Sequence, residues 1–495
     1  MAKIIKIKDS IITVKGKEKY TKDEHYKLSK NTFGIVLSAN ETGAKLLIIG
    51  DPHEVKINTT ITKITSGNKI DVYEHYFGKL IDPFGNIVHP ANFKKPSKPK
   101  KIGTSQRLNQ SPSIIERVKL SEPLDTGILA IDTMIPIGKG QRELIIGDRT
   151  TGKTSIALST IINQRKKGVK CIYVAIGQKR NSVISFYNTL EENDALDNVI
   201  GIFANPDSSA QQYLSPTIGM AMAEALAYKG EDVLIVIDDL TKHANVYREI
   251  SLSIGRNPGR EAYPTDIFFQ HSSLLERSGN FSKNFGSGSI TCLPIVETVQ
   301  GDLASLIPSN IISITDGQIF TDSDAFNKGL FPAINIQLSV SRTGSSIQSK
   351  EVREASKNLK SDHAMLSEIK KFADMSIDIS ESLIKKIEKW DGINNMLVQY
   401  GYLGYTRNMI ILLIIMFKKG MLGKLKESPE FSNAFRWLCK NDKIAKNILK
   451  NISSNKNEKL DKQIEIVFGS LADVASGIYG GLFSKKEFNK MKGGK

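Results

Sequence analysis

The sequence has few cysteines and no long apolar run. Its cysteines are far apart, form an odd set and show no CxxC spacing, and they are Cys171, Cys292 and Cys439. They therefore indicate neither a disulfide framework nor a zinc site, and they suit a reducing compartment. The longest apolar run, Met409 to Phe417, is about half the length that a membrane-spanning helix needs. The first ten residues alternate lysine with isoleucine and lack the apolar core of a signal peptide. These absences predict a soluble, cytoplasmic protein.

Acidic residues are outnumbered by basic ones. The 495-residue chain has 52 Asp and Glu against 68 Lys and Arg, a net charge of +16. Such a balance suits nucleic acid, an acidic membrane surface or an acidic protein as a partner. The lysines are spread along the whole chain, however, and dispersed charge speaks against nucleic acid. Hydrophobic residues make up 40% and charged residues 24%, which excludes disordered, collagen-like and disulfide-built chains, and the length predicts about three domains.

The N-terminal zone has the pattern of short β-strands. Alternating or β-branched runs separated by turn residues cover 3–8, 10–16, 33–39, 44–50 and 54–64, which is typical of a small barrel or sandwich. A stretch rich in proline and lysine at 89–103 indicates an exposed connection.

Two further zones follow. From about Glu116, predicted strands at 142–147, 169–177 and 232–239 alternate with predicted helices at 154–167 and 215–230, a pattern that favours a mostly parallel sheet covered by helices. From about Lys350 the β signals vanish, and 350–375, 382–390 and 408–420 have helical patterns. We therefore expect a multidomain protein with a β domain at 1–72, an α/β domain at 73–349 and an α-helical bundle at 350–495.

One motif specifies a phosphate site. Residues 147–154, GDRTTGKT, fit G-x-x-x-x-G-K-[ST] between a predicted strand and a predicted helix, which is the context that the P-loop, or Walker A motif, requires. Glycines let backbone N–H groups approach the phosphates at the positive helix N-terminus. Lys153 should contact the β- and γ-phosphates, and the hydroxyl of Thr154 should bind Mg²⁺.

An acidic pair after a buried strand supplies the second half of the site. Asp238 and Asp239 end the run VLIVIDD, a Walker B pattern, and we expect Asp238 to complete the magnesium site. Hydrolysis also needs a group that polarises the attacking water, usually a carboxylate. The expected place is the end of the strand beside the P-loop strand, which we take to be CIYVAIG, and this strand ends in Gln178. An amide orients a water but cannot accept its proton, so the sequence predicts binding without efficient turnover.

Several stretches together resemble the α subunit of rotary F-type ATP synthases. They include IPIGKGQRELIIGDRTTGKTSIA, CIYVAIGQKR, VLIVIDDLTKHANVYREISL, GREAYPTDIFFQHSSLLERSG and PAINIQLSVSR, and the likeness is densest from about Gly127 to Gly344. The resemblance implies an N-terminal β-barrel, a central P-loop domain of the RecA-like type and a C-terminal helical domain. It also implies a hetero-hexamer in which three α chains alternate with three catalytic β chains around a rotating shaft. This head belongs to a membrane-associated rotary motor that links ATP hydrolysis or synthesis to hydrogen ion transport.

The resemblance also implies roles for individual residues. An α chain binds Mg²⁺ with ATP or ADP at an essentially non-hydrolysing interface site, and Gln178 matches a position where the β chain carries glutamate. The matching nucleotide contacts are Gly147, Asp148, Arg149, Thr150, Thr151, Gly152, Lys153, Thr154, Ser155, Gln178 and Asp238, with Phe326 and Gln399 at the adenine. In the run LSVSR, Arg342 would reach the catalytic site of the neighbouring β chain, and Ser339 lies in a region required for activity.

The sequence departs from the family pattern around the base. Thr150 replaces the glutamine that follows GDR, Phe331 replaces an arginine before PAIN, and Gly401 replaces the second glutamine of a QGQ pattern. Each change removes a polar group, which puts tight, adenine-selective binding in doubt. Tyr400 and Tyr402 offer rings that either stack on a base or pack in a loop.

The two ends depart from the pattern as well. The family's helical arm, which anchors a peripheral stalk, is not found before the first barrel strand, so we expect no conventional stalk cap on this subunit. The C-terminal zone shows little resemblance to the family and ends in a Gly-rich, basic tail at 478–495. Together with the changed pocket, these features suggest a diverged F-type-like ATPase coupled to membrane-linked or surface machinery. We expect it in the cytoplasm, at the membrane through its complex.

Other functions fit parts of the pattern. The first is the α subunit of an ordinary proton-translocating ATP synthase. The second is a Rho-like hexameric RNA translocase, against which Gln178 and the long helical zone speak, and the third is a free-standing P-loop binding protein. Whether the chain is itself an enzyme stays open, because a regulatory subunit of an ATPase need not turn over nucleotide.

Overall fold

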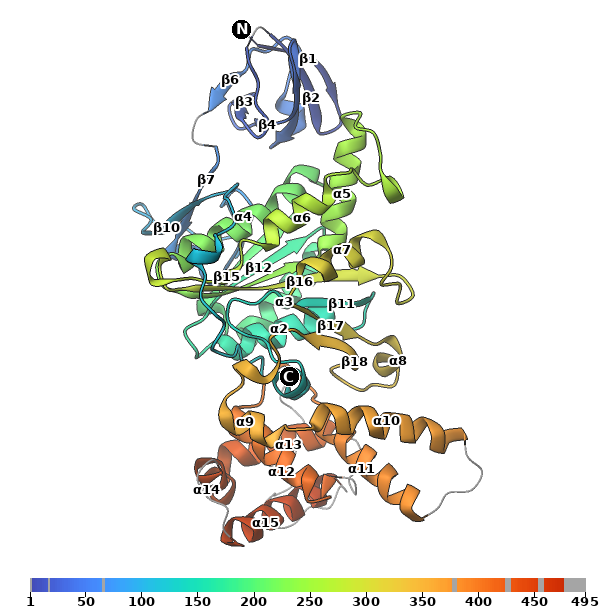
Figure 1. Cartoon of the computed structure of the whole chain (residues 1–495). Coiled ribbons are helices and arrows are strands. Elements are labelled where there is room, and N and C mark those ends of the chain that lie inside the picture. Colours follow the sequence, from blue (N-terminus) through green and yellow to red (C-terminus); the bar gives the residue numbers. More distant parts are fainter. Residues whose placement is uncertain are drawn as a thin grey trace. The chain divides into compact units, whose positions relative to one another are not determined.

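The computed structural model describes residues 2–16, 18–64, 67–375, 381–422, 429–452 and 458–475. Its chain, which Figure 1 colours along the sequence, divides into two compact units. The first consists of Met1–Leu120, Lys139–Ile146 and Gln164–Asp316, and the second of Ser121–Gly138, Gly147–Asn163 and Gly317–Lys495. Each unit is thus built from separate stretches of sequence, and the domain limits at 1–72, 73–349 and 350–495 stay predictions.

The N-terminal strands of the first unit form the predicted barrel. Their antiparallel order is β1-β2-β5-β4-β3-β6. The strands are β1 (Lys3–Lys8), β2 (Ile11–Lys15), β3 (His25–Lys27), β4 (Phe33–Asn40), β5 (Gly43–Ile49) and β6 (Thr62–Ile64). The segment before β6 returns to β1: the amide of Ile4 donates to the carbonyl of Thr59 at 3.1 Å, and that of Asn58 to the carbonyl of Ile4 at 2.8 Å. These bonds close the sheet on itself.

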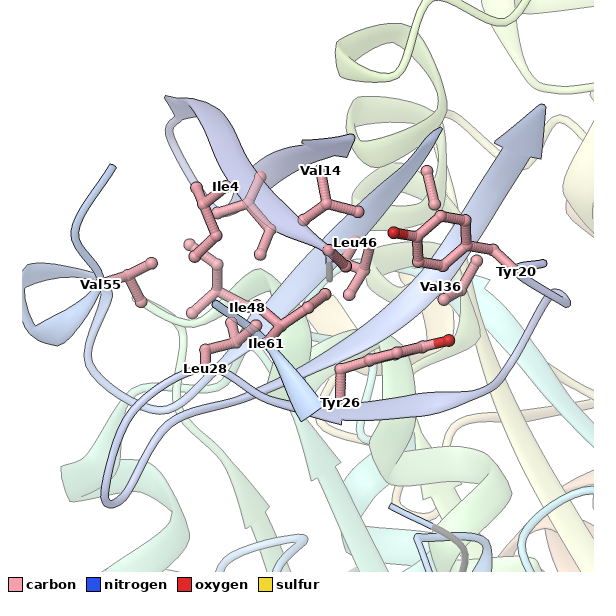
Figure 2. Close-up of a cluster of buried hydrophobic side chains, with 13 residues drawn as sticks. Ile4, Val14, Tyr20, Tyr26, Leu28, Val36, Leu46, Ile48, Val55 and Ile61 are labelled. Atoms are coloured by element: carbon pink, nitrogen blue, oxygen red, sulfur yellow. The ribbon is translucent and has the colours of Figure 1, made fainter. Parts of the chain in front are cut away.

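Alternate side chains of these strands fill the barrel. Figure 2 shows Val14, Val36, Leu46 and Ile48 turned toward one another with the ring of Tyr26 beside them, and all five are at most 3% exposed. This period of two is the signal that made the strands predictable from sequence.

One predicted strand, 54–64, is largely wrong. Residues Pro52–Glu54 form a 3-10 helix in which Asp51 accepts a hydrogen bond from the amide of His53, and only Thr62–Ile64 is a strand. The side chain of an Asp before a proline binds the local backbone and starts a turn, which overrides the β-branched pattern that follows. The short strand β3 was not predicted from the sequence.

A mixed, mainly parallel sheet forms the rest of the first unit. Its order is β11-β16-β14-β12-β13-β8-β9, with β15 beside β16, and β7 and β10 pair separately. The strands are β7 (Lys69–Tyr73), β8 (Lys79–Ile81), β9 (Ile87–His89), β10 (Lys101–Gln106), β11 (Leu144–Asp148), β12 (Lys170–Ile176), β13 (Val199–Ala204), β14 (Asp232–Asp238), β15 (Gly279–Asn280) and β16 (Ser289–Thr298). The predicted strand–helix alternation is thereby confirmed, including the strands at 142–147, 169–177 and 232–239.

The order of strands corrects one expectation. Strand β12, which ends next to Gln178, is not the neighbour of β11, because β16 and β14 lie between them. The crossover after β11 leaves room for two strands that come later in the chain, and sequence order does not reveal such gaps.

Helices cover this sheet. They are α3 (Arg180–Glu192), α4 (Ser209–Ala227), α5 (Leu240–Ser253), α6 (Ile267–Leu275) and α7 (Leu306–Ile314). Helix α4 contacts β12, β13 and β14 as well as β7 and β10. It is apolar on nearly all sides, since an enclosed helix needs no polar face.

The second unit combines the phosphate loop with the C-terminal helices. Strands β17 (Gly317–Thr321) and β18 (Ile334–Ser341) pair in antiparallel fashion. The helices are α1 (Leu129–Met134), α2 (Lys153–Gln164), α8 (Ser323–Asn327), α9 (Lys350–Ala355), α10 (Leu359–Met375), α11 (Glu381–Leu397), α12 (Arg407–Lys418), α13 (Pro429–Asn441), α14 (Lys443–Asn451) and α15 (Glu458–Ala475). Helix α12 is the apolar centre of the bundle, in contact with α9, α11 and α14, so the predicted helical zone is confirmed. The basic tail at 478–495 lies outside the described residues.

Candidate nucleotide-binding site

The phosphate loop runs from the end of β11 to the start of α2. A Cβ on Gly147 would lie 2.1 Å from the Oγ1 of Thr321 and 2.5 Å from its carbonyl oxygen, so only glycine fits there. Gly152 has a φ of +88° and Thr150 one of +62°, and a threonine in this left-handed region is strained. The loop therefore keeps the conformation typical of the motif, even at Thr150, whose side chain does not favour it.

The loop is held together by its own side chains. The Nζ of Lys153 donates to the carbonyl oxygens of Gly147 at 3.0 Å and Asp148 at 2.5 Å, and only 6% of the residue is exposed. The hydroxyl of Thr151 donates to the carbonyl of Asp148 at 2.8 Å, and it lies 2.6 Å from the hydroxyl of Thr321. The ammonium group thus lies inside the curve of the loop, where the motif requires a cation.

The remaining motif residues lie at the surface. Arg149, Thr150 and Ser155 are exposed and Thr154 is half-buried in the first turn of α2. The carboxylate of Asp148 accepts a hydrogen bond from Ser323 at 3.2 Å, which ties the loop to α8. A half-buried hydroxyl at the positive end of a helix suits a bound cation–phosphate pair.

A pocket of about 380 Å³ adjoins the loop within the same unit. It is lined by Ile128, Thr151, Gly152, Ser155, Ile156, Ser159, Phe326, Phe331, Pro332, Ala333, Gln399, Tyr400, Gly401 and Tyr402. The structure therefore brings the predicted base contacts Phe326 and Gln399 next to the phosphate loop. Its size falls within the usual range for small-ligand sites, about 300–1,000 Å³.

Aromatic rings form one end of this pocket. Phe326 and Phe331 are edge to face with centroids 5.2 Å apart, and Phe331 and Tyr400 with centroids 6.0 Å apart. The hydroxyl of Tyr400 donates to the carbonyl of Gly329 at 3.0 Å. The loop tyrosine is thereby fixed as part of the wall.

Gln399 is committed to the backbone. Its Oε1 accepts from the amide of Leu129 at 3.3 Å, and its Nε2 donates to the carbonyls of Gly127 at 2.9 Å and Leu403 at 3.4 Å. Both amide hydrogens and one lone pair are thus used. The side chain joins the segment before α1 to the loop after α11.

The acidic residue of the second motif lies in the first unit. Asp238 is 3% exposed at the end of β14, and its Oδ2 accepts from the hydroxyl of Tyr173 at 2.9 Å. The Nε2 of Gln178 donates to the carbonyl of Asp238 at 3.3 Å, and its Oε1 lies 3.5 Å from the Tyr173 hydroxyl. The predicted residues Gln178 and Asp238 are therefore neighbours, joined through a tyrosine.

The second acid of the pair has another task. Asp239 caps α5 by accepting from the amide of Lys242 at 2.7 Å and pairs with its ammonium at 3.3 Å. Burial raises the pKa of Asp239 to about 6, against the opposing effect of Lys242. The geometry thus gives Asp239 a structural role and leaves Asp238 as the candidate ligand of a cation.

Two predicted residues lie on β18 and just after it: Ser339, expected in a region required for activity, and Arg342, expected to act on a partner. Ser339 is fully buried; it accepts from the amide of Phe320 at 2.9 Å and donates to the carbonyl of Asn335 at 2.6 Å, so it fastens the β17–β18 hairpin. Arg342, just beyond β18, is exposed. Among the described residues, its guanidinium has no ion pair or hydrogen bond.

Known proteins resemble the chain over most of its length. The family described as "ATP synthase alpha/beta family, nucleotide-binding domain" matches residues 127–341, and "ATP synthase alpha/beta chain, C terminal domain" matches 348–471. A protein of Mycoplasmopsis pulmonis named ATP synthase subunit alpha 2 is 43% identical over 84% of this chain and 82% of its own length. The ATP synthase subunit alpha of Mycoplasma capricolum is 39% identical over 93% of this chain and 88% of its own length.

The chain belongs to the family of F-type ATP synthase alpha subunits.

This membership agrees with the barrel, the P-loop domain and the helical zone. The match over residues 348–471 corrects the expectation that the C-terminal zone has little resemblance to the family. No helix in the described part of this alpha-family chain has the length and apolar character needed to span a bilayer. Sequence reasoning missed Tyr173, which binds both Asp238 and Gln178. The available signal was a single hydroxyl in the otherwise apolar run CIYVAI, since a buried hydroxyl needs a partner.

Proposed function

We propose that this chain is the nucleotide-binding, essentially non-hydrolysing subunit of a rotary F-type or F-type-like ATPase head. In this head it alternates with a catalytic β-like subunit, three copies of each, around a central rotating shaft. It binds Mg²⁺ with ATP or ADP and supplies Arg342 to the neighbouring catalytic site.

The amide at position 178 carries the proposal that the chain does not hydrolyse ATP. The attacking water of a hydrolysing site loses a proton, which a carboxylate accepts and an amide cannot. The amide of Gln178 is already oriented by Tyr173 and the carbonyl of Asp238, at 3.5 and 3.3 Å. A water placed there would be held but not activated.

Binding is assigned to the phosphate loop. Lys153 lies inside the loop, and the loop's amides, at the start of α2, face the phosphates. In this assignment Thr154 and Asp238 hold Mg²⁺, which offsets phosphate charge when bound. Arg149 and Ser155 lie exposed at the rim, where they contact the outer phosphate oxygens.

Arg342 is proposed to act on a partner. An arginine that stabilises its own fold is normally paired, whereas the guanidinium of Arg342 has no partner among the described residues and is exposed. Its planar fork suits the oxygens of a transferring phosphoryl group. The buried bonds of Ser339 keep β18, and so the residue three positions later, in a fixed place.

A first experiment tests the isolated chain. We expect Mg-ATP to bind and turnover to stay far below an ordinary enzyme rate of about 1 s⁻¹ or more. Lys153→Ala should abolish binding, while the control Lys166→Ala removes an exposed lysine just beyond α2 and should leave it intact. Rapid hydrolysis by the pure chain would contradict the proposal.

A second experiment tests the partner role. In a head reconstituted with its catalytic subunit, Arg342→Ala should lower hydrolysis by about 10³–10⁵, the usual contribution of an arginine supplied in trans. Arg342→Lys should restore little, and Arg353→Ala, at an exposed arginine of α9, should change little. If Arg342→Ala instead hydrolysed ATP within about threefold of the wild-type rate, the loss would be far smaller than such a contribution. Arg342 would then have only a structural role.

The family supports a proposal for the wider setting. We propose that the head works on the cytoplasmic side of a membrane, to which it is joined through the other parts of its complex. It couples to a proton-driven rotor or to other membrane-linked or surface machinery. Identification of the proteins that co-purify with the native chain distinguishes these settings.

A further inference from the structure

The pocket beside the phosphate loop offers a base large apolar faces. Phe326, Phe331 and Tyr400 form successive edge-to-face pairs, and Ile128 and Ile156 line the same pocket. Every nucleobase has an apolar π-face, so stacking of this kind holds a base without reading its edge. Phe331 and Gly401, which line the pocket as well, have no hydrogen-bonding group in their side chains.

The polar side chain best suited to read a base is already engaged. Gln399 carries the pocket's side-chain amide, and both of its N–H hydrogens are donated to backbone carbonyls. One lone pair of its Oε1 accepts from Leu129, and the residue is 6% exposed. A fixed donor next to a fixed acceptor would distinguish the edges of adenine and guanine, but this amide presents no such pair.

The other polar side chains are hydroxyls. Ser155, Ser159 and Tyr402 line the pocket, while the hydroxyls of Thr151 and Tyr400 are already bonded to the carbonyls of Asp148 and Gly329. A hydroxyl rotates to act as a donor or an acceptor. It therefore serves the amino group of adenine and the carbonyl of guanine equally well.

We propose that this pocket holds the nucleotide base by stacking, with hydroxyls that serve either purine edge, and accepts ATP, GTP and ITP with similar affinity. The inference rests on the proposed function, because the phosphate loop supplies the common part of the binding energy. It names purine nucleoside triphosphates, and not ATP specifically, as the ligand class. Pyrimidine nucleotides bind more weakly, since a single ring offers less surface for stacking.

The test is a competition titration on the full chain with Mg²⁺ and a fluorescent ATP analogue. We expect dissociation constants for ATP, GTP and ITP within about threefold of one another, and a weaker one for CTP. A base-reading site would separate ATP from GTP by about tenfold or more, because a hydrogen-bonding group left unmet is costly. Such a separation would overturn the inference while leaving the proposed function in place.

Variants separate stacking from the phosphate contacts. Phe331→Leu keeps an apolar side chain but loses the ring, and it should weaken all three purine nucleotides by about fivefold with their ratios unchanged. The control Phe268→Leu changes an exposed phenylalanine of α6 that does not line the pocket. Unchanged affinities in Phe331→Leu, or a loss confined to ATP, would overturn the inference. If wild type bound none of the nucleotides, both the inference and the proposed function would fail.

Discussion

Glu224 and Arg277 form an ion pair in the interior of the first unit, and its removal gives the largest stability effect that we predict. Glu224 lies on α4 and Arg277 follows α6, and their side chains are 0% and 3% exposed. Two parallel bonds join them, from Nε to Oε1 and from Nη2 to Oε2, both 2.7 Å long. Ser105 adds a bond to the carboxylate at 2.6 Å.

The energetic cost follows from this enclosure. Arg277→Met leaves a buried carboxylate with its charge uncompensated, and Glu224→Gln leaves a buried guanidinium in the same state. Breaking a buried pair on one side costs about 3–5 kcal/mol, which is a large part of a typical stability of about 5–15 kcal/mol. The double variant Glu224→Gln with Arg277→Met should cost clearly less than the sum of the two single changes, because no unpaired charge remains.

Thermal unfolding of the four proteins at neutral pH measures this cycle, with the midpoint as readout. At about 2 °C per kcal/mol for a unit of this size, each single variant should unfold roughly 6–10 °C earlier. The control is Glu74→Gln, since Glu74 and Lys100 form an ion pair with side chains 59% and 75% exposed; it should change stability by less than about 0.5 kcal/mol. Single variants as stable as this control, or a double variant whose loss equals the sum of both, would refute the reasoning.

Three further predictions concern buried groups and the phosphate loop. Burial lowers the pKa of His243 to about 4 and that of His271 to about 3, whereas a histidine in the unfolded chain has a pKa of about 6.5. As the pH falls, the unfolded state therefore takes up protons first. The free energy of unfolding should then fall between about pH 6.5 and 4, by about 1.4 kcal/mol per pH unit for each histidine. His243→Gln should flatten this slope in denaturant titrations at several pH values, and an unchanged slope would contradict the assignment. Gly147→Ala should abolish nucleotide binding because its Cβ has no room, whereas Gly469→Ala, with nothing within 4 Å, should leave binding unchanged; equal binding by both variants would disprove the steric argument. Ser339→Ala should destabilise the chain by about 1–3 kcal/mol, since a buried backbone amide loses its acceptor, and a loss of partner hydrolysis without any loss of stability would instead give the hydroxyl a direct role.

The sequence allowed a good prediction wherever a signal was local. The barrel strands have a period of two, α2 and α12 are long apolar-patterned helices, and residues 147–154 are a contiguous motif. Short strands such as β3 and β8 escaped, because three residues carry too little pattern and are stabilised by partners far along the chain.

The candidate site was predictable in its parts but not in its contacts. Phe326 and Gln399 do line a pocket beside the loop, as the resemblance implied. That the amide of Gln399 is used by Gly127 and Leu129 could not be predicted, because these residues lie more than 250 positions earlier. The same applies to the separation of β11 from β12, which depends on strands that come later in the sequence.

The interleaving of the two units bears on how the protein is made. A ribosome that has released residues up to Asp316 has produced all of the first unit but only two short pieces of the second, Ser121–Gly138 and Gly147–Asn163. The lining of the nucleotide pocket runs from Ile128 to Tyr402. After the phosphate loop has been made, some 250 further residues must therefore be translated before the wall of the nucleotide pocket is complete. Nucleotide capture is thus a property that the chain acquires late in its synthesis. A chain that ended before α11 would carry the motif but lack the part of the pocket wall formed by residues 399–402.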